Sequence, residues 1–583
     1  METYVSLHSK VISAVLNLLL LTLAAAAQAQ TGAPLTSSQA GVFYEDKLKG
    51  LSELTVLGND LFGDRVSLYT GGIQFTQVDV DLPGNNALPM RFSRTLKMGG
   101  RRDTLKSMRD WDFDLPYISG MFGQSGWVSM VPGEPLRRCS IPLNSPQQAS
   151  APSEYVSGGQ GNVGFSFDPH FFWGGLSLSL PGSDSKPMII MAAGAKQPTD
   201  GRAYHWTTAD RWVFSCLPST SNGESGEAFM AHAPNGDRYW FDRIVAIPRG
   251  TMTANYGNGF FNYTSTMGLR EFRALPTRIE DRNGNFITFT YSPSQVVMSA
   301  SDGRSITVNS GADGVQNVVA NGRTWNYEYT GSTVDRKLTR VALPDGSSWS
   351  FDAGAAFDNP IGGWRNCADF VPFTPGPSSS ATVVMTHPSG ARGTFEMSYR
   401  LHGRTNAPNT CRPFTQIFYP VESHLLTVLA LDRKVISGPG LATMTWSYQY
   451  TPLAASLDTG QHVYCSTTPC PETRALTVTR EDGSWDRFTF SQKYGDLEGQ
   501  LLSEERGNTQ GVLRRIDTQY RRSSDGSYAR IGSNPCWSCS KEEELPKPLE
   551  SRTTTQDGNT FLYRVDQFDA YARPLKITRS SSP

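Results

Sequence analysis

The sequence has almost no net charge and no dense run of basic residues. Its 53 lysines and arginines nearly balance its 54 aspartates and glutamates, so the formal net charge at pH 7 is only −1. A protein that binds nucleic acid through the phosphates needs a concentrated basic surface. This charge pattern therefore argues against a nucleic-acid partner. The charged fraction of 18% is also below the roughly 25% typical of soluble domains, which favours many turns and much sheet.

Catalytic and cofactor motifs are scarce as well. The eight histidines are scattered, with no H-E-x-x-H and no close pair, and no G-x-S-x-G is present. Gly159–Gly164 reads G-x-G-x-x-G, but no helical pattern follows that could hold a pyrophosphate. Paired carboxylates such as Glu280 with Asp281, or Asp79 with Asp81, lie beside turns or alternate along strands, where acidic residues normally face solvent. We expect no enzyme activity, cofactor or metal, and rank a glycoside hydrolase below non-enzymatic functions.

Long hydrophobic runs are absent after the first 26 residues. The run Val11–Ala26 ends in Ala27-Gln28-Ala29, an A-x-A cleavage pattern, and predicts a signal peptide over residues 1–29. The alternative is an uncleaved membrane anchor, against which Asn17 and Thr22 within the run argue. No later run is long enough to cross a bilayer. We predict a protein exported to the periplasm, the cell surface or the medium.

All eight cysteines lie in the predicted mature chain, in an even number that suits an oxidising compartment. Short spacing predicts two bridges and proximity suggests two more, namely Cys465 with Cys470, Cys536 with Cys539, Cys139 with Cys216, and Cys367 with Cys411. The alternative for the C-x-x-C at Cys536 and Cys539 is zinc, which needs a second such pair or paired histidines. A thioredoxin-like role needs a βαβ pattern that is missing there. A structural disulfide is the favoured interpretation.

The chain does contain a recurring sequence motif, in which an Asn-Gly or Asp-Gly pair is followed by alternating aromatic and polar residues. The motif occurs at Asn235-Gly236, Asn283-Gly284, Asn321-Gly322, Asp345-Gly346, Asp482-Gly483 and Asp557-Gly558. Such pairs tolerate positive backbone angles and predict tight two-residue turns between strands. Several copies recur about every 20 to 25 residues, and a unit of this size must pair with its neighbours to bury its apolar face. We predict an all-β fold, an extended antiparallel sheet of hairpin repeats.

The mature chain is expected to divide into two regions. Residues 30–268 form an N-terminal β-rich region, in which Val78–Leu82, a turn at Pro83–Asn86 and Leu88–Arg94 predict a first hairpin. Residues 269–583 form the region of hairpin repeats. Inward aromatics of these repeats, such as Trp325, Tyr327, Tyr329, Trp349 and Phe351, are expected to pack between strands.

Several segments resemble the RHS/YD-repeat family of bacterial proteins. The resemblance rests on Gly58–Asp64, Tyr69–Gly71 and Leu82–Pro89 at the opening, on Leu275–Asn285 and Leu338–Ser347 as repeats, and on the tail Phe568–Leu575. The tail is similar to the signature Tyr-Asp-x-x-Gly-Arg-Leu, with Phe568 for Tyr, Ala572 for Gly and Pro574 inserted. The resemblance covers most of the mature chain. It implies a long sheet that curls into a hollow shell, often around a toxic C-terminal domain, in exported proteins of interbacterial competition, surface contact or carbohydrate binding.

The chain also departs from that family's toxin carriers. They have an Asp-Pro-x-Gly type junction after the repeats, whereas the only Asp-Pro here is Asp168-Pro169, so no self-cleavage residues are carried over. Little sequence follows Leu575, which predicts a shortened relative or the front part of a system whose core and toxin belong to a downstream polypeptide.

Two functional classes remain at this stage. The first is a structural shell component without catalysis. The second is a cell-surface module that binds glycans, for which the aromatic cluster Phe171, Phe172 and Trp173 is the candidate stacking site.

Overall fold

The structure is a computed structural model. It describes residues 61–84, 88–98, 110–123, 126–127, 136–140, 154–157, 164–167, 175–183, 185–192, 195, 197–257, 262–332, 336–353, 380–407, 425–460, 462–465, 467–495, 497–522, 525–526, 528–529 and 546–583. The chain divides into two units, Met1–Leu61 and Phe62–Pro583, and every element below belongs to the second. Apart from a single 3-10 turn at Asp525, the regular elements of the described residues are strands. The predicted all-β fold is confirmed.

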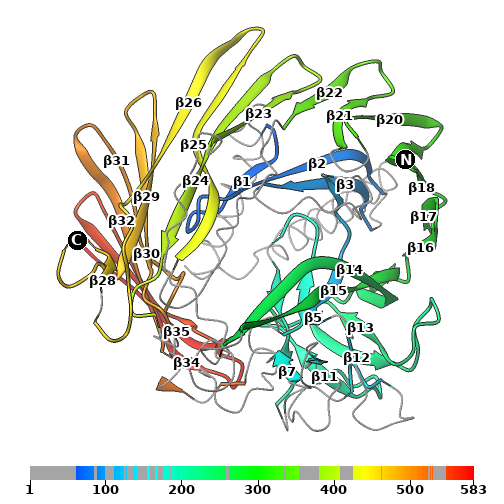
Figure 1. Cartoon of the computed structure of the whole chain (residues 1–583), viewed down its shortest axis with the longest axis horizontal. Coiled ribbons are helices and arrows are strands. Elements are labelled where there is room, and N and C mark those ends of the chain that lie inside the picture. The colour runs from blue at the N-terminus through cyan, green and yellow to red at the C-terminus, as the bar shows by residue number, and fades with distance from the viewer. Residues whose placement is uncertain are drawn as a thin grey trace, which may run out of the picture. The chain divides into compact units, whose positions relative to one another are not determined.

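A large antiparallel sheet of 27 strands contains most of the chain (Figure 1). From β10 onward, neighbours in the sheet are neighbours in sequence, interrupted only by the short pair β27 and β28. Its main series is β10 (Ile189–Ile190), β11 (Tyr204–Thr207), β12 (Val213–Leu217), β13 (Ala228–His232), β14 (Arg238–Gly257), β15 (Asn262–Glu280), β16 (Phe286–Ser292), β17 (Gln295–Ala300), β18 (Ser305–Gly311), β19 (Gly314–Ala320), β20 (Arg323–Thr330), β21 (Lys337–Ala342), β22 (Ser348–Asp352), β23 (Ser380–Thr386), β24 (Arg392–Gly403), β25 (Leu425–Gly438), β26 (Leu441–Tyr450), β29 (Thr473–Arg480), β30 (Trp485–Ser491), β31 (Leu501–Asn508), β32 (Gly511–Tyr520), β33 (Leu549–Gln556), β34 (Asn559–Phe568) and β35 (Pro574–Ser582).

Three smaller groups of strands accompany this series. A side branch on β15 consists of β5 (Tyr117–Gly123), β8 (Ser177–Ser179) and β9 (Lys186–Pro187). The small sheet consists of β1 (Asp64–Val66), β2 (Ile73–Leu82), β3 (Met90–Lys97) and β4 (Asp112–Phe113), and includes the hairpin predicted near its start. Two isolated pairs are β6 (Glu154–Ser157) with β7 (Gly164–Phe167), and β27 (Ala455–Ser456) with β28 (His462–Tyr464).

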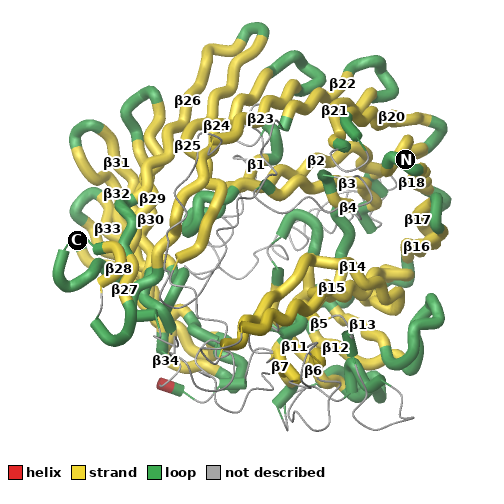
Figure 2. The backbone as a smooth tube through the Cα atoms, in the orientation of Figure 1, coloured by secondary structure: helices red, strands yellow, loops and turns green. Residues whose placement is uncertain are grey.

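Turns explain why consecutive strands pair (Figure 2). Asn321-Gly322 and Asp557-Gly558 are two-residue turns, and both residues of each have positive φ angles. At the other four predicted positions the two-residue turn is wrong, because the loop is longer and only the glycine has positive φ. Around Gly284, for example, the Gly284 amide donates to the Asp281 carbonyl and the Asp281 amide donates to the Asn285 carbonyl. The Asn or Asp before the glycine still helps to cap such loops, as when the Ser347 amide donates to Asp345 Oδ1.

Alternation of side chains along the strands produces one buried face. In β20, Trp325 and Tyr327 are 9% and 6% exposed, whereas Asn326 and Glu328 between and beyond them face solvent. Trp349 and Phe351 are buried in the same way. The expected inward packing is thus confirmed for these four aromatics, and Tyr329 is half-buried with its hydroxyl donating to the Val315 carbonyl.

The position expected for a regional boundary, between residues 268 and 269, lies inside β15. This strand pairs with β14 along a ribbon that extends from Arg238 opposite Glu280 to Gly257 opposite Asn262. A hydrophobic core, separate from the one between the two sheets described below, lies where this ribbon meets the side branch. It includes Phe122, Trp206 and Phe241. The large sheet therefore continues through both expected regions.

The small sheet packs on the buried face of the large sheet. The Phe75 ring of β2 lies 4.8 Å from that of Phe395 in β24, and Phe62 meets Phe395 and Trp349 edge-on at 5.9 and 6.2 Å. Phe92 of β3 meets Tyr327 at 6.1 Å. Fully buried aromatic rings thus form the main core between the two sheets.

Candidate functional site

The turn between β34 and β35 is built around one aspartate. Asp569 Oδ1 accepts hydrogen bonds from the backbone amides of Tyr571 and Arg573 at 2.8 and 2.9 Å. The Asp569 amide donates to the Arg573 carbonyl, which closes the loop. Ala572 has a φ of 61°, in the left-handed region that favours glycine, and it occupies the glycine position of the signature. The geometry explains why the signature pairs an aspartate with a glycine three residues later.

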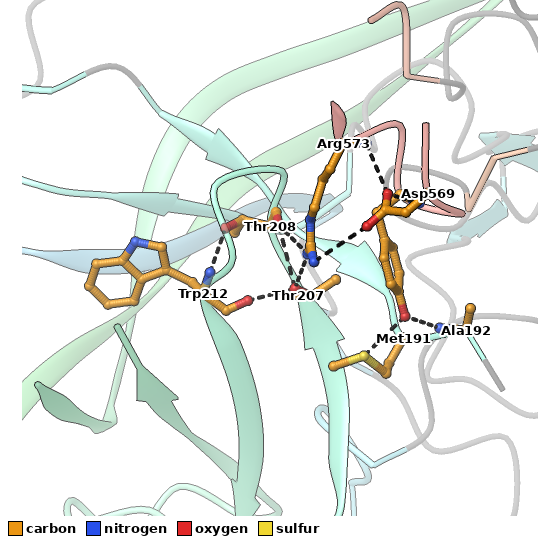
Figure 3. A network of polar contacts seen from close by, with 8 residues as sticks. Met191, Ala192, Thr207, Thr208, Trp212, Asp569 and Arg573 are labelled. Carbon is orange, nitrogen blue, oxygen red and sulfur yellow. Dashed lines mark hydrogen bonds and ion pairs between the residues drawn. The ribbon is translucent and has the colours of Figure 1, made fainter. Parts of the chain in front are cut away.

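This turn presents Arg573 to the first strands of the large sheet (Figure 3). Tyr571 of the same turn contacts the residues that follow β10. The Tyr571 hydroxyl accepts a hydrogen bond from the Ala192 amide at 2.6 Å and donates to Met191 Sδ at 3.0 Å. Arg573 Nη2 donates to Thr207 Oγ1 at 2.7 Å and to the Thr208 carbonyl at 2.8 Å. We refer to these six residues, Met191, Ala192, Thr207, Thr208, Tyr571 and Arg573, as the closing contact.

The closing contact joins the last strand pair of the series to the first. Its residues are 365 to 380 positions apart in sequence, and Tyr571 is only 6% exposed. The Thr207 hydroxyl donates to the Trp212 carbonyl, so its oxygen is oriented to accept from Arg573. Burial raises the pKa of Tyr571 above its ordinary value of 10.0. The contact therefore holds two sheet ends together through specific side-chain hydrogen bonds.

Replacing Arg573 with Met should loosen this contact. A hydrogen bond from a charged group is worth about 1.5–3 kcal/mol, so we expect the local stability of β10 and β11 to fall by at least about that amount. Hydrogen exchange of the amides around Ile189–Ala192 and Tyr204–Thr208 measures it. Arg579→Met is the matched control, because Arg579 is an exposed arginine of β35 that lies over the Tyr563 ring. Equal exchange in the two variants would contradict a stabilising role for Arg573.

Buried charges form the second notable feature, between the small sheet and the large sheet. Arg94 Nε lies 2.7 Å from Asp79 Oδ2, and the two side chains are 0% and 1% exposed. The Tyr327 hydroxyl of β20 donates to the same Asp79 oxygen at 2.8 Å. The Arg94 guanidinium also lies over the rings of Trp111 and Phe351, at 4.3 and 4.5 Å. One fully buried ion pair thus connects three parts of the core.

Two further cations hold the small sheet in place. Lys434 of β25 forms an ion pair with Asp64 of β1, and both side chains are at most 5% exposed. Arg304, after the β17 strand, donates to the carbonyls of Leu82 and Leu88, which flank the turn between β2 and β3. These contacts fix both ends of the small sheet on the face of the large one.

The carboxylates considered as a catalytic pair have other partners. The expectation that Asp79 faces solvent is wrong, because a β-bulge between Val78 and Val80 interrupts the alternation of β2, and the Asp79 carboxylate pairs with Arg94 in the core. Asp81 points outward and pairs with Arg91. Glu280 is bound by Arg238 and Arg278, and Asp281 accepts hydrogen bonds from Asn285 that lower its pKa. Each of these four carboxylates therefore has a structural partner.

Two of the expected disulfides lie in the described residues, and both are present. Cys139 is bonded to Cys216, inside the core beside the β15 branch, and Cys465 is bonded to Cys470 in the loop before β29. Nearby, the Glu227 carboxylate accepts hydrogen bonds from the Cys139 and Ser140 amides. The other four cysteines (Cys367, Cys411, Cys536 and Cys539) lie outside the described residues.

Other expected features also lie outside the described residues, namely the signal peptide, residues 159–163 of the G-x-G-x-x-G motif, and the aromatic cluster Phe171, Phe172 and Trp173. In the part that the structure describes, no three His, Cys, Asp or Glu side chains are grouped to hold a metal ion. Within the same ranges, no helix is long and apolar enough to pass through a membrane.

Comparison with known proteins gives distant structural similarity alone. No family model matches the chain, and no curated protein matches it. The crystal structures of TcdB2-TccC3-TEV and TcdB2-TccC3 match 91% and 89% of this chain at 8% and 9% identity, with TM-scores of 0.30 and 0.27. The chain spans 44% and 37% of their respective lengths. The N-terminal domain of effector protein SpvB from Salmonella typhimurium strain LT2 matches 64% of this chain and 94% of that one, at 10% identity and a TM-score of 0.14.

Proposed function

We propose that this chain is an exported, non-enzymatic protein of RHS/YD-repeat type, and that its continuous sheet is the wall of a shell in a toxin-delivery or contact-dependent competition system. The observation that carries the proposal is the closing contact. A series of sequential antiparallel strands whose first and last members are joined by Tyr571 and Arg573 is suited to enclosing space. The sequence signature around Asp569 supports the same interpretation.

The polar residues gathered in this protein support a structural function. The buried pair of Arg94 and Asp79 satisfies its charges internally, and Lys434 does the same with Asp64. Together with the Tyr327 hydrogen bond to Asp79, these pairs fasten the small sheet to the buried face of the large sheet, which suits a rigid wall. In this proposal the toxic activity belongs to a separate polypeptide, which the wall protects or presents.

A competition assay tests the proposal in the source strain. Deleting the gene for this chain should abolish killing of a susceptible neighbour, and expression of the wild-type chain should restore it. The double variant Tyr571→Phe/Arg573→Met should restore killing poorly, whereas Arg579→Met should restore it fully. Undiminished killing by the deletion strain would overturn the proposal. Glycan binding by the purified protein that is lost in Trp173→Ala with an intact fold would instead assign it to adhesion.

A further inference from the structure

A lysine and an aspartate lie buried together where the first strand of the small sheet meets the large sheet. Lys434 Nζ of β25 is 2.5 Å from Asp64 Oδ2 of β1, and the two residues are 370 positions apart in sequence. Their side chains are 3% and 5% exposed. The ion pair of Lys186 with Asp210 has a similar separation, 2.7 Å, but its side chains are 27% and 44% exposed. The first pair thus brings an amine and a carboxyl group into contact away from water.

Aromatic side chains line the site of this buried pair. The Lys434 nitrogen lies 5.0 Å from the centre of the Trp446 ring and 5.9 Å from that of the Phe395 ring. Tyr448, which follows in β26, is also close, because burial raises the pKa of its hydroxyl and the Asp64 carboxylate raises it further. The attraction of a cation to such rings is much weaker than its hydration in water. Keeping both charges here therefore costs free energy, and a reaction that removes them is favoured by the surroundings.

We propose that Lys434 and Asp64 condense to a side-chain amide, which links β25 covalently to β1. The ammonium first passes a proton to the carboxylate across their hydrogen bond, which leaves a neutral amine and a carboxylic acid. The amine nitrogen then attacks Asp64 Cγ, one N–H proton moves to the departing hydroxyl, and the C–O bond breaks to release one water molecule. No oxidant or other reactant is consumed.

Two features of the site promote this condensation. Groups held in contact react as if they were at a very high concentration, and the buried site excludes the water that would reverse the step. The Tyr448 hydroxyl serves in the proton transfer, because a hydroxyl can accept a proton from the nitrogen while it donates its own to the departing oxygen. The amide concerns how the small sheet is attached, so the inference goes beyond the proposed function and does not depend on it.

Peptide mapping of the purified full chain by mass spectrometry tests the amide, after all disulfides have been reduced. Trypsin should release residues 50–65 joined to residues 434–474, because it does not cut after an acylated lysine. The joined product should be lighter by one water than the sum of the two peptides. The linked chain should also run faster than the unlinked chain on a denaturing gel, since its closed loop keeps it more compact. The same search should find no amide between Lys186 and Asp210, which are the exposed matched pair.

The variant Lys434→Arg separates the amide from the ion pair. Its guanidinium can still bind Asp64, so the chain should fold, but it should give no joined peptide and should run on the gel as an unlinked chain. Tyr448→Phe should slow the accumulation of joined peptide at least about 10-fold, and an unchanged rate would exclude Tyr448 from the proton transfer. Wild-type peptides that stay separate after several days under native conditions would overturn the proposal.

Discussion

Replacing Arg94 with Met will lower the free energy of unfolding by about 3–5 kcal/mol, because it leaves the charged Asp79 carboxylate buried in the core without its cation. Both side chains are at most 1% exposed, so water cannot replace the lost partner. The Tyr327 hydroxyl offers one hydrogen bond to Asp79, which cannot balance a full charge. The guanidinium's contacts with Trp111 and Phe351 disappear as well.

Urea unfolding followed by tryptophan fluorescence measures this loss. Arg91→Met is the matched control, because Arg91 is an arginine of the same strand β3 whose pair with Asp81 is exposed, and it should cost at most about 1 kcal/mol. The double variant Asp79→Asn/Arg94→Met should recover most of the stability. It removes the unpaired buried charge, and the amide oxygen of the new side chain still accepts the hydrogen bond from the Tyr327 hydroxyl. If Arg94→Met and Arg91→Met were equally stable, the pair would not be buried in solution.

Local signals predicted the hairpins well. Asn321-Gly322 and Asp557-Gly558 specify their turns because both residues must adopt positive φ, a constraint visible in the residue types themselves. At Asn283-Gly284 the sequence predicted a two-residue turn, but the loop is longer. Its length depends on the backbone hydrogen bond from the Asp281 amide to the Asn285 carbonyl. Residue type alone does not reveal where such a loop closes.

Long-range contacts left no comparable signal. Asp79 meets Tyr327 across 248 positions, and strand alternation places each on a face without revealing which face the small sheet covers. In the closing contact, the tail signature marked Arg573 but left Tyr571 at an unspecified position, and the Arg573 partners Thr207 and Thr208 are ordinary strand-end residues. The structure was needed to show which of the many polar groups these two side chains reach.

Replacing Phe395 with Ala will cost about 3–5 kcal/mol, through lost burial and the cavity that remains between the two sheets. The Phe395 ring is 0% exposed and meets Phe75 and Phe62 of the N-terminal segment edge-on. Lys434, which binds Asp64, lies 5.9 Å from the same ring. The cavity therefore opens beside a buried ion pair, and repacking to fill it would disturb that pair.

The damage should concentrate on the small sheet, because Phe395 belongs to β24, which keeps its ladder with β23 and β25. Limited proteolysis should accordingly cut within Ile73–Lys97 well before it cuts the large sheet. Phe561→Ala is the control, since Phe561 is 49% exposed, and its change should stay within about 0.5 kcal/mol. A Phe395 variant whose small sheet resists proteolysis as the wild type does would mean that the ion pairs of Arg94 and Lys434, rather than aromatic packing, hold the two sheets together.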